Sequence, residues 1–384
     1  MAKSTGRKSP AGGDGHRKVR YAVVGLGHIA QVAALPAFEH AKKNSVLAAL
    51  VSDDEAKLKK LARKYQVEHT FTYETYDECL RSGEVDAVFI ATPNSLHRDF
   101  AVPAARAGVH VLCEKPLEAT VSACQEIIDA CAEAGVKLMT AYRLHFERAN
   151  LQAAEIARSG KLGDVRLFNS TFTMQVEDED NIRLKRHLGG GPLLDIGIYC
   201  VNASRYLFRD EPVEVMALTA RGDDPRFEEV EELAGAVLRF PGERLATFVV
   251  SFNASEISSF RIVGTKGDLR VEPAYSYTKD LVHQLTIGGR TRERTYPRRD
   301  QFAGELLYFS ECVLENRQPE PSGHEGLIDV AIVQAIFRSA EQRQAVSLEL
   351  PEKTVRPTLR QEKRLPPVKA KPKTVRTSSP KGGS

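Results

Sequence analysis

The chain has 384 residues, of which 42% are hydrophobic and 27% charged, and its formal net charge at pH 7 is +3. This length favours two domains of ordinary size, and no run approaches the roughly 18 consecutive apolar residues that a membrane span needs. The first residues are basic and polar and lack the apolar stretch of a secretory signal, so we expect a cytoplasmic protein without membrane contact.

Residues 19–142 alternate short β-branched runs with amphipathic stretches. Strands are predicted at 21–25, 46–51, 86–91, 109–113 and 137–141, and helices up to about 43 and at 55–65, 95–107 and 120–134. Gly108 and Gly135 are placed to end two of these helices. The alternation predicts βαβ units, and therefore an α/β domain built on a parallel sheet.

The segment Gly25-Leu26-Gly27-His28-Ile29-Ala30 follows the first strand and opens the next helix. A Gly-x-Gly-x-x-Ala pattern occurs often by chance, but at this place each small residue has a physical purpose. Gly25 permits the tight turn, Gly27 lets the backbone approach a pyrophosphate, and Ala30 lets the helix pack on the sheet. The segment therefore predicts a dinucleotide site.

The end of the second strand bears on the choice between NAD and NADP. Asp53 favours NAD, because a carboxylate accepts hydrogen bonds from ribose hydroxyls. Ser52 and Lys57 favour NADP, because a hydroxyl and an ammonium can donate to a 2′-phosphate. Lys57 can equally be a solvated helix residue, so the residues alone leave both cofactors open.

Polar clusters also follow the later strands. Thr92-Pro93-Asn94-Ser95-Leu96-His97 can wall a nicotinamide ribose, or it can be a proline turn that caps the next helix. Glu114-Lys115-Pro116 is either a surface turn or a site where a lysine with a depressed pKa donates to a substrate oxygen or contacts the ribose. Arg143 is predicted to contact substrate or to make a salt bridge at the domain junction.

Ligands of α/β folds bind at the carboxyl ends of the strands. The glycine segment and Lys115 both belong to such ends of one sheet. Together they indicate a nicotinamide-dependent oxidoreductase.

After residue 143 the rhythm changes, and most strands follow one another through short turns. They are predicted at 165–175, 213–220, 233–240, 245–252, 260–263 and 268–271, which favours a largely antiparallel sheet. A Gly189-Gly190-Gly191-Pro192 turn and a helix at 193–206 interrupt the run, and helices at 300–315 and 324–341 close it. The second half is therefore predicted to be α+β.

Asp195 and Tyr199 stand four residues apart on the helix after Pro192, so their side chains share one face. A buried tyrosine beside a hydrogen-bonded aspartate is a common structural pair. Alternatively, the phenol of Tyr199 passes a proton to a carbonyl or takes one from an alcohol, while Asp195 anchors a sugar hydroxyl or tunes Lys115. The histidines and cysteines show no ligand spacing, so no metal site is predicted.

Basic residues are concentrated at the two ends of the chain. Residues 1–20 hold six Lys/Arg and one acidic residue, residues 353–384 hold ten and one, and the body between them is acidic. Both ends are rich in Pro, Ser and Gly and lack interleaved aromatic residues, so we predict disordered tails and no nucleic-acid partner.

The glycine segment, the 92–97 cluster, Glu114-Lys115-Pro116, the glycine turn and the Asp195–Tyr199 pair together resemble the motifs of the Gfo/Idh/MocA oxidoreductases. The resemblance covers about residues 19–346 and is strongest to the glucose–fructose oxidoreductase branch. It implies an N-terminal Rossmann domain with a doubly wound parallel sheet and a C-terminal domain with a large, mostly antiparallel open sheet. It also implies a homo-oligomer, dimer or tetramer, and a pyranose or polyol held between the domains.

The resemblance also implies roles. Lys115, Asp195 and Tyr199 match the family's catalytic lysine, aspartate and acid/base residue, although many members have histidine in place of tyrosine. Arg183 matches an arginine near the cofactor or substrate. Because Ser52 and Lys57 match a branch that uses NADP, we expect NADP, with NAD possible.

These expectations form one prediction. The domains are a disordered tail at 1–18, a Rossmann domain at 19–142, a substrate-binding and oligomerisation domain at 143–350, and a disordered Pro-rich tail at 351–384. The predicted cofactor-binding residues are Gly25, Leu26, Gly27, His28, Ile29, Ser52, Lys57, Pro93, Asn94, His97, Glu114, Lys115 and Arg183. Arg143, Asp195 and Tyr199 are predicted to contact substrate.

The predicted activity is hydride transfer between a nicotinamide and a sugar carbon. Two alternatives remain: an NAD-dependent inositol or polyol dehydrogenase, and a dinucleotide-sensing regulator whose basic tails contact nucleic acid.

Overall fold

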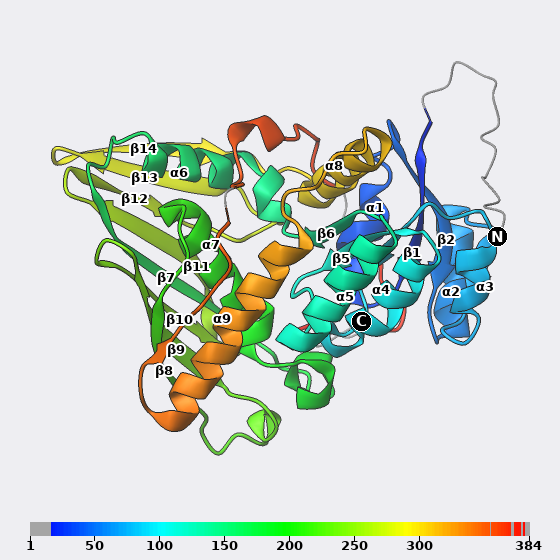
Figure 1. Cartoon of the computed structure of the whole chain (residues 1–384), viewed down its shortest axis with the longest axis horizontal. Helices are drawn as coiled ribbons and strands as arrows, with labels where there is room; N and C mark the ends of the chain where they lie inside the picture. Colours follow the sequence, from blue (N-terminus) through cyan, green and yellow to red (C-terminus); the bar gives the residue numbers. More distant parts are fainter. Residues whose placement is uncertain (1–16, 354, 370–371, 378, 381–384) are drawn as a thin grey trace, which may run out of the picture.

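The computed structural model describes residues 17–353, 355–369, 372–377, 379 and 380, and it arranges them around two sheets (Figure 1). The first sheet is parallel, with strand order β3-β2-β1-β4-β5-β6. Its strands are β1 Val19–Val24, β2 Ser45–Val51, β3 His69–Phe71, β4 Ala87–Ile90, β5 His110–Glu114 and β6 Leu138–Ala141. The order reverses between β1 and β4, which is where a doubly wound sheet opens a ligand crevice.

Helices connect these strands. They are α1 Leu35–Ala37, which continues a π-helical turn at Ala30–Ala34, α2 Glu55–Tyr65, α3 Tyr76–Arg81, α4 His97–Arg106 and α5 Val121–Glu133. The predicted terminators after α4 and α5 are confirmed, since Gly108 and Gly135 have φ angles of 76° and 67°. β3 and α3 were not predicted, because His69–Phe71 is too short to show a period.

The two faces of the first sheet are covered by different parts of the chain. Successive β1 side chains point to opposite faces, so Ala22 and Val24 pack in the cluster that contains α4 and α5. Tyr21 and Val23 pack on the other face, in the cluster that contains α8 (Gln301–Leu314). The Tyr21 hydroxyl lies 2.7 Å from Ser310 Oγ of that helix. The range 143–350 therefore includes a helix that packs on the first domain.

The second sheet has nine strands in the order β14-β13-β12-β11-β7-β10-β9-β8-β15. Neighbours are antiparallel except β7 and β10, so the predicted mostly antiparallel sheet is confirmed. The strands are β7 Val165–Gln175, β8 Glu214–Ala220, β9 Leu233–Phe240, β10 Arg244–Ser251, β11 Asn253–Gly264, β12 Gly267–Val271, β13 Leu281–Ile287, β14 Arg290–Tyr296 and β15 Val346–Ser347. The sequence analysis missed β13 and β14; six of the seven β14 residues are exposed, so this edge strand shows no apolar alternation.

Three helices cover one face of the second sheet (Figure 1). They are α6 Arg148–Arg158, α7 Ile198–Phe208, which continues a π-helical turn at Leu193–Gly197, and α9 Gly323–Gln342. Short 3₁₀ turns lie at Asn94–Leu96, Arg143–Phe146, Ile182–Leu184, Arg186–Leu188, Pro225–Phe227 and Leu359–Gln361. Within the described residues, no helix combines the length and apolar character needed to cross a bilayer.

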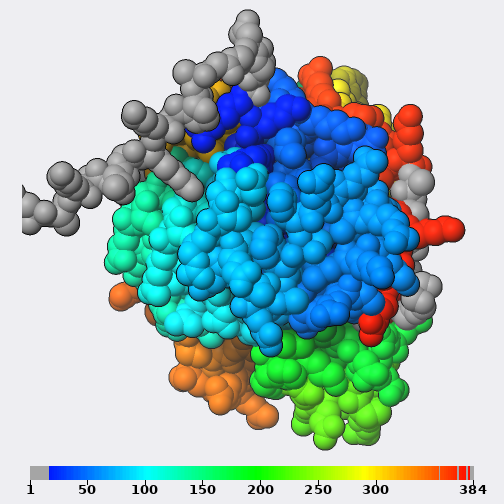
Figure 2. Space-filling model, turned by 90° about the vertical axis from the view of Figure 1, so that its right-hand side faces the viewer, coloured from blue at the N-terminus to red at the C-terminus, as the bar shows by residue number. Residues whose placement is uncertain are grey.

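The predicted disorder of 351–384 is wrong for the described residues of that segment. Arg356 and Gln361 are buried, and Figure 2 shows the segment in red along one edge of the blue first domain. Four of its basic residues pair with carboxylates of the body: Lys353 with Glu320, Arg356 with Glu211, Lys363 with Glu311, and Arg376 with Asp54. The composition of a segment indicates only whether that segment can bury enough apolar surface to fold by itself. Here the acidic body of the protein supplies carboxylates that pair with the basic residues of the segment. The predicted tail at 1–18 lies outside the described residues except for 17 and 18.

Candidate active site

A cleft of about 380 Å³ lies between the two sheets, at the carboxyl ends of β1, β4 and β5. The parallel sheet contributes the loops that follow those strands, and the second half contributes the 182–199 segment and parts of β7. Twelve of the predicted site residues line this cleft: Gly27, His28, Ile29, Lys57, Pro93, Asn94, Glu114, Lys115, Arg143, Arg183, Asp195 and Tyr199.

The glycine segment has the geometry that a phosphate site needs. Gly25 has φ +87°, and a Cβ there would lie 2.7 Å from the backbone of Ala91, so only glycine fits. A Cβ at Gly27 would meet no atom within 4 Å, which leaves open space beside the backbone of the cleft wall. Leu26 is buried in the core and does not line the cleft.

A second observation at this cleft also fits a dinucleotide. Thr92 Oγ1 is buried on the cleft wall and has no hydrogen-bond partner within the described part of the chain. Buried hydroxyls are rarely left unpaired, so such an atom fits a bound polar group. With the open backbone at Gly27, it supports a ribose or phosphate at this end of the sheet.

Lys115, Asp195 and Arg183 form a chain of ion pairs across the cleft. Lys115 Nζ donates to Asp195 Oδ1 at 2.9 Å and to the Asp195 backbone carbonyl at 2.7 Å. Arg183 Nε donates to the other carboxylate oxygen at 2.7 Å. Both oxygens of Asp195 are therefore held, and the carboxylate fixes the position of the ammonium.

The charges in this chain shift the pKa values of its members. Burial works against the charged form of Asp195, but Lys115 and Arg183 outweigh burial and hold the pKa of Asp195 below its ordinary value. For Lys115, burial lowers the pKa, but Asp195 and Tyr199 outweigh it and the pKa is raised. The predicted depressed pKa of this lysine is therefore wrong, because the prediction counted the apolar strand and not the carboxylate of the other domain.

Tyr199 lies between two cations. Lys115 Nζ is 4.9 Å from the centre of its ring, and the Arg143 guanidinium carbon is 5.0 Å away. Arg143 is itself fixed, since it donates to the side chain of Gln301 and, at 2.7 Å, to the backbone carbonyl of Tyr275. The phenol is thus 8% exposed, faces the cleft and is surrounded by positive charge.

Glu114 and Glu305 are buried carboxyls behind the lysine. Burial raises the pKa of Glu114 to about 7, although Lys115 and Arg143 act in the opposite direction. Burial also raises the pKa of Glu305, helped by the charge of Glu114. Glu305 lies in α8 and escaped the sequence analysis, because nothing in the sequence shows that this helix returns to the first domain.

Two predicted cofactor residues have structural roles instead. His97 is fully buried; its ring nitrogens face the backbone carbonyls of Pro116 at 3.0 Å and Thr92 at 3.1 Å. It therefore connects two strand-end loops and does not line the cleft. Burial lowers the pKa of His97 to about 4, so the ring is neutral at physiological pH.

Ser52 is also absent from the cleft lining. It is 1% exposed, and its hydroxyl donates to Asp53 at 3.4 Å. Lys57 does line the cleft, together with Arg376, which lies in the segment predicted to be disordered.

Asn94 connects the two halves of the cleft. Its amide donates to the carbonyl of Gly189 at 2.8 Å, and a Cβ on Gly189 would lie 2.8 Å from the Cβ of Asn94. The glycine turn is thus needed for the loops to approach one another. Phe172, Met174, Tyr277 and Phe302 add an apolar wall that the sequence analysis did not identify.

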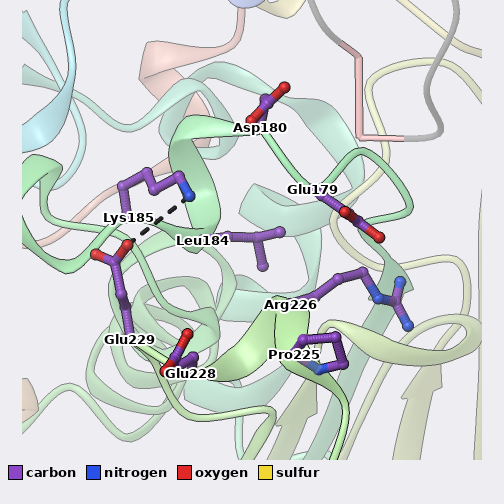
Figure 3. Close-up of a pocket in the computed structure, with 8 residues that line it drawn as sticks. All are labelled: Glu179, Asp180, Leu184, Lys185, Pro225, Arg226, Glu228 and Glu229. Atoms are coloured by element: carbon purple, nitrogen blue, oxygen red, sulfur yellow. Dashed lines mark ion pairs between the residues drawn. The ribbon is translucent and has the colours of Figure 1, made fainter.

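A separate surface hollow, drawn in Figure 3, lies beside the Pro225–Phe227 turn. Its wall is mostly charged: Glu179, Asp180, Lys185, Arg226, Glu228 and Glu229. Lys185 and Glu229 pair across it at 3.7 Å. None of the predicted catalytic residues lines this hollow, so the chemistry is placed in the larger cleft.

Comparison with known proteins gives two family matches. A model described as an oxidoreductase family with an NAD-binding Rossmann fold matches residues 19–142. A model described as the GFO/IDH/MocA C-terminal domain matches residues 150–270.

Individual relatives cover most of the chain. It is 34% identical over 337 residues to D-xylose 1-dehydrogenase (NADP(+)) of Haloarcula marismortui, covering 86% of this chain and 93% of the relative. The crystal structure of aldose-aldose oxidoreductase from Caulobacter crescentus with glycerol matches with TM-score 0.83 and 40% identity, covering 86% of this chain and 100% of that one. A 3-ketoreductase from Actinomadura kijaniata with NADP and TDP-benzene matches with TM-score 0.78 and 26% identity, covering 84% and 98%.

Proposed function

Because the chain belongs to the Gfo/Idh/MocA oxidoreductase family, we propose that it is an NADP-preferring sugar oxidoreductase that acts at C1 of an aldopyranose. The observation that carries this proposal is the cluster of Lys115, Asp195 and Tyr199 at the wall of a dinucleotide cleft. Two similar proteins, named as a D-xylose 1-dehydrogenase and an aldose-aldose oxidoreductase, support the choice of an aldose.

When bound, the nicotinamide accepts or supplies the hydride. Tyr199 holds and moves the proton: its phenol gives a proton to the substrate oxygen during reduction and takes one from it during oxidation. The ammonium of Lys115 and the guanidinium of Arg143, both near the ring of Tyr199, would favour negative charge that develops on the reacting substrate oxygen.

Asp195 is assigned as a positioning residue. Its two carboxylate oxygens are engaged by Lys115 and Arg183, so it holds the ammonium in place and keeps it charged. The sequence suggested two roles for Asp195, which were to tune Lys115 or to anchor a sugar hydroxyl. These contacts agree with the first role, because Asp195 raises the pKa of Lys115.

The cofactor would be held at the backbone of Gly27, the hydroxyl of Thr92 and the ammonium of Lys57. Lys57 supports NADP, because a 2′-phosphate needs cationic donors at the end of β2. The relative from Haloarcula marismortui is named as NADP-dependent.

A second candidate is an NAD-dependent dehydrogenase of an inositol or related polyol. Asp53 favours it, since this exposed carboxylate follows β2, where ribose hydroxyls are bound in NAD enzymes. The relatives with aldose names weigh against it.

The two candidates separate in a steady-state assay of a substrate panel. Purified protein would be supplied with NADP⁺ or NAD⁺ and with aldopyranoses, myo-inositol or acyclic polyols. We expect the protein to reduce NADP⁺ when an aldopyranose is the substrate. Turnover restricted to myo-inositol with NAD⁺ would establish the second candidate instead.

We also propose that the chain forms a homo-oligomer through the open face of the second sheet. Exposed apolar side chains gather on that face, among them Leu167, Met216, Leu218, Val237, Leu245 and Val249. A contiguous apolar sheet face of this kind is typical of a surface that pairs with a second copy.

A further inference from the structure

The last described part of the chain crosses the opening of the dinucleotide cleft. We define this strap as residues 372–377 with 379 and 380. Arg376, Thr377 and Pro380 line the same cleft as Gly27 and Lys57. The strap is therefore part of the wall of the proposed cofactor site. The composition of this segment did not predict that position.

One end of the strap is tied to the glycine segment. Gln31 is fully buried, and its side chain pairs with the Val375 backbone: the amide donates to the carbonyl at 3.0 Å, and Val375 N–H donates back at 2.7 Å. The same amide donates to the carbonyl of Leu26 at 2.8 Å. Lys64 adds a hydrogen bond to the Lys373 carbonyl at 3.2 Å.

The other end is tied to the second half of the molecule. The backbone N–H of Glu177 donates to the Pro380 carbonyl at 2.8 Å, and the Asn181 amide donates to the Ser379 carbonyl at 3.3 Å. Asn181 also caps the short turn that presents Arg183 to the cleft. The strap thus spans from one cleft wall to the other.

Between these ties, Arg376 is held at the end of the cleft that lies beside the end of β2. Its Nη1 lies 3.2 Å from Asp54 Oδ1, and the same oxygen accepts the backbone N–H of Lys57 at 3.0 Å. Asp54 therefore brings the guanidinium to the first turn of α2, where Lys57 lies. Two cations beside the end of β2 match the charge and the bidentate geometry of a phosphate monoester.

We infer that the strap closes over the adenosine end of the cleft and that Arg376, with Lys57, binds the 2′-phosphate of NADP(H). The strap then selects NADP over NAD, offsets the repulsion from Asp53, and slows release of the dinucleotide. This inference rests on the proposed function, because it assigns the phosphate of that cofactor.

The test measures binding alone, with NADPH, NADH, 2′,5′-ADP and 5′-AMP as probes on the full-length protein. Arg376→Ala should weaken NADPH and 2′,5′-ADP by about tenfold or more and leave NADH and 5′-AMP within about twofold. Arg364→Ala is the matched control, because this exposed arginine of the same segment pairs with Glu362 and does not line the cleft. Equal weakening of all four probes, or no weakening, would overturn the assignment.

A chain that ends at Lys371 lacks the whole strap. It tests whether the strap slows release of the dinucleotide. Stopped-flow displacement should show faster dissociation of both NADPH and NADH than from the full chain. Tighter binding, or dissociation as slow as from the full chain, would contradict the inference. If the shortened chain fails to fold, the Arg376→Ala result still decides. Wild-type protein that bound none of the four probes would refute the proposed function itself.

Discussion

At the scale of single residues, the site is an ammonium fixed by a carboxylate beside a phenol. Lys115 Nζ has two acceptors on Asp195, at 2.7 and 2.9 Å, and lies 4.9 Å from the ring centre of Tyr199. A lysine held in this way acts as a permanent positive charge and leaves the proton transfer to the phenol. This division of roles makes two separable predictions.

Tyr199→Phe should lower kcat by about 10²- to 10⁴-fold, because it removes the proton donor and keeps the ring. The dissociation constant of NADPH should stay unchanged. Tyr275→Phe is the matched control, since its ring stacks on Tyr199 with centroids 5.9 Å apart and its hydroxyl contacts Ser170 at 2.7 Å. Steady-state kinetics with the preferred aldose measures both variants, and full turnover by Tyr199→Phe would remove the acid/base assignment.

Asp195→Asn should change the pH dependence of kcat. In the wild type the pKa of Lys115 is raised because Asp195 outweighs burial, so the ammonium persists well above neutral pH. Without the carboxylate, burial lowers that pKa, and the lysine loses its charge as pH rises through the lower value. The basic limb of the profile should therefore move to lower pH by about one unit or more.

Arg183→Met serves as the comparison for this profile. It removes the other partner of Asp195 and leaves the Lys115 pair in place, so the basic limb should stay where it is. A wild-type profile in the Asp195→Asn variant would show that Asp195 does not set the charge of Lys115.

The sequence could place the strand-end residues but not their partners. Lys115 and the glycine segment follow apolar strands, and parallel strands present their carboxyl ends at one edge, so their proximity was predictable. Tyr277, Phe302 and Arg376 reach the same cleft from distant parts of the chain, and no local periodicity in the sequence predicts a tertiary contact. His97 and Ser52 are buried in the structure, which the sequence could not show, because a polar residue at a strand end can either line a cleft or be buried as a support.

At the scale of elements, α7 and α9 are joined by a buried charge cluster. Arg205 is fully buried in α7, and its guanidinium contacts Glu211 together with Glu325 at 3.1 Å and Asp329 at 2.6 Å in α9. Burial works against the charged form of Glu325, but Arg205 and Lys353 outweigh it, so the pKa of Glu325 is lowered. Removing the guanidinium would leave the buried carboxylate of Asp329 without its ion-pair partner, whereas Lys353 would still pair with Glu325.

Arg205→Met should therefore destabilise the fold by about 3–5 kcal/mol, since breaking a buried pair costs more than the pair itself contributes. Arg158→Met is the control, because Arg158 is exposed and, among the described residues, its ion-pair partner is the surface residue Glu155, where a loss of about 0.5 kcal/mol is expected. Thermal denaturation compares the two variants. A midpoint for Arg205→Met equal to that of the control would show that the cluster does not stabilise the helix pair.

The elements that were predicted and missed differ in how they bury their side chains. β9 alternates buried and exposed residues and was predicted at its observed bounds, 233–240. β14 has no buried face to mark it, and the C-terminal segment folds through ion pairs with the body. Charge complementarity between distant segments leaves no periodic pattern in the sequence. The opposite net charges of the acidic body and the basic C-terminal segment were therefore the only sign that the two could pair.

At the scale of the whole molecule, the open face of the nine-stranded sheet carries exposed apolar side chains that no described helix covers. Val249 is 48% exposed at the centre of that face, in β10 between β7 and β9. Side chains on this face do not contribute to the monomer core, so a charge there should disturb association and not folding.

Val249→Glu should shift the protein from dimer or tetramer towards monomer, because two copies would bring buried carboxylates together. Val355→Glu is the control, since Val355 is 61% exposed and lies outside the sheet. Sedimentation velocity reports the oligomeric state of both variants and of the wild type. A monomeric wild type, or an unchanged assembly of Val249→Glu, would show that the open face is not the contact between copies.

Hydride transfer from C1 of the sugar to the nicotinamide can be measured directly with a labelled hydrogen. Aldopyranoses carrying deuterium at C1 would be incubated with the enzyme and NADP⁺, and the reduced cofactor would be analysed by mass spectrometry. We expect one deuterium on the nicotinamide ring and a slower reaction than with unlabelled sugar. Reduced cofactor without deuterium, or no reduction by any aldopyranose although NADP⁺ binds, would contradict it.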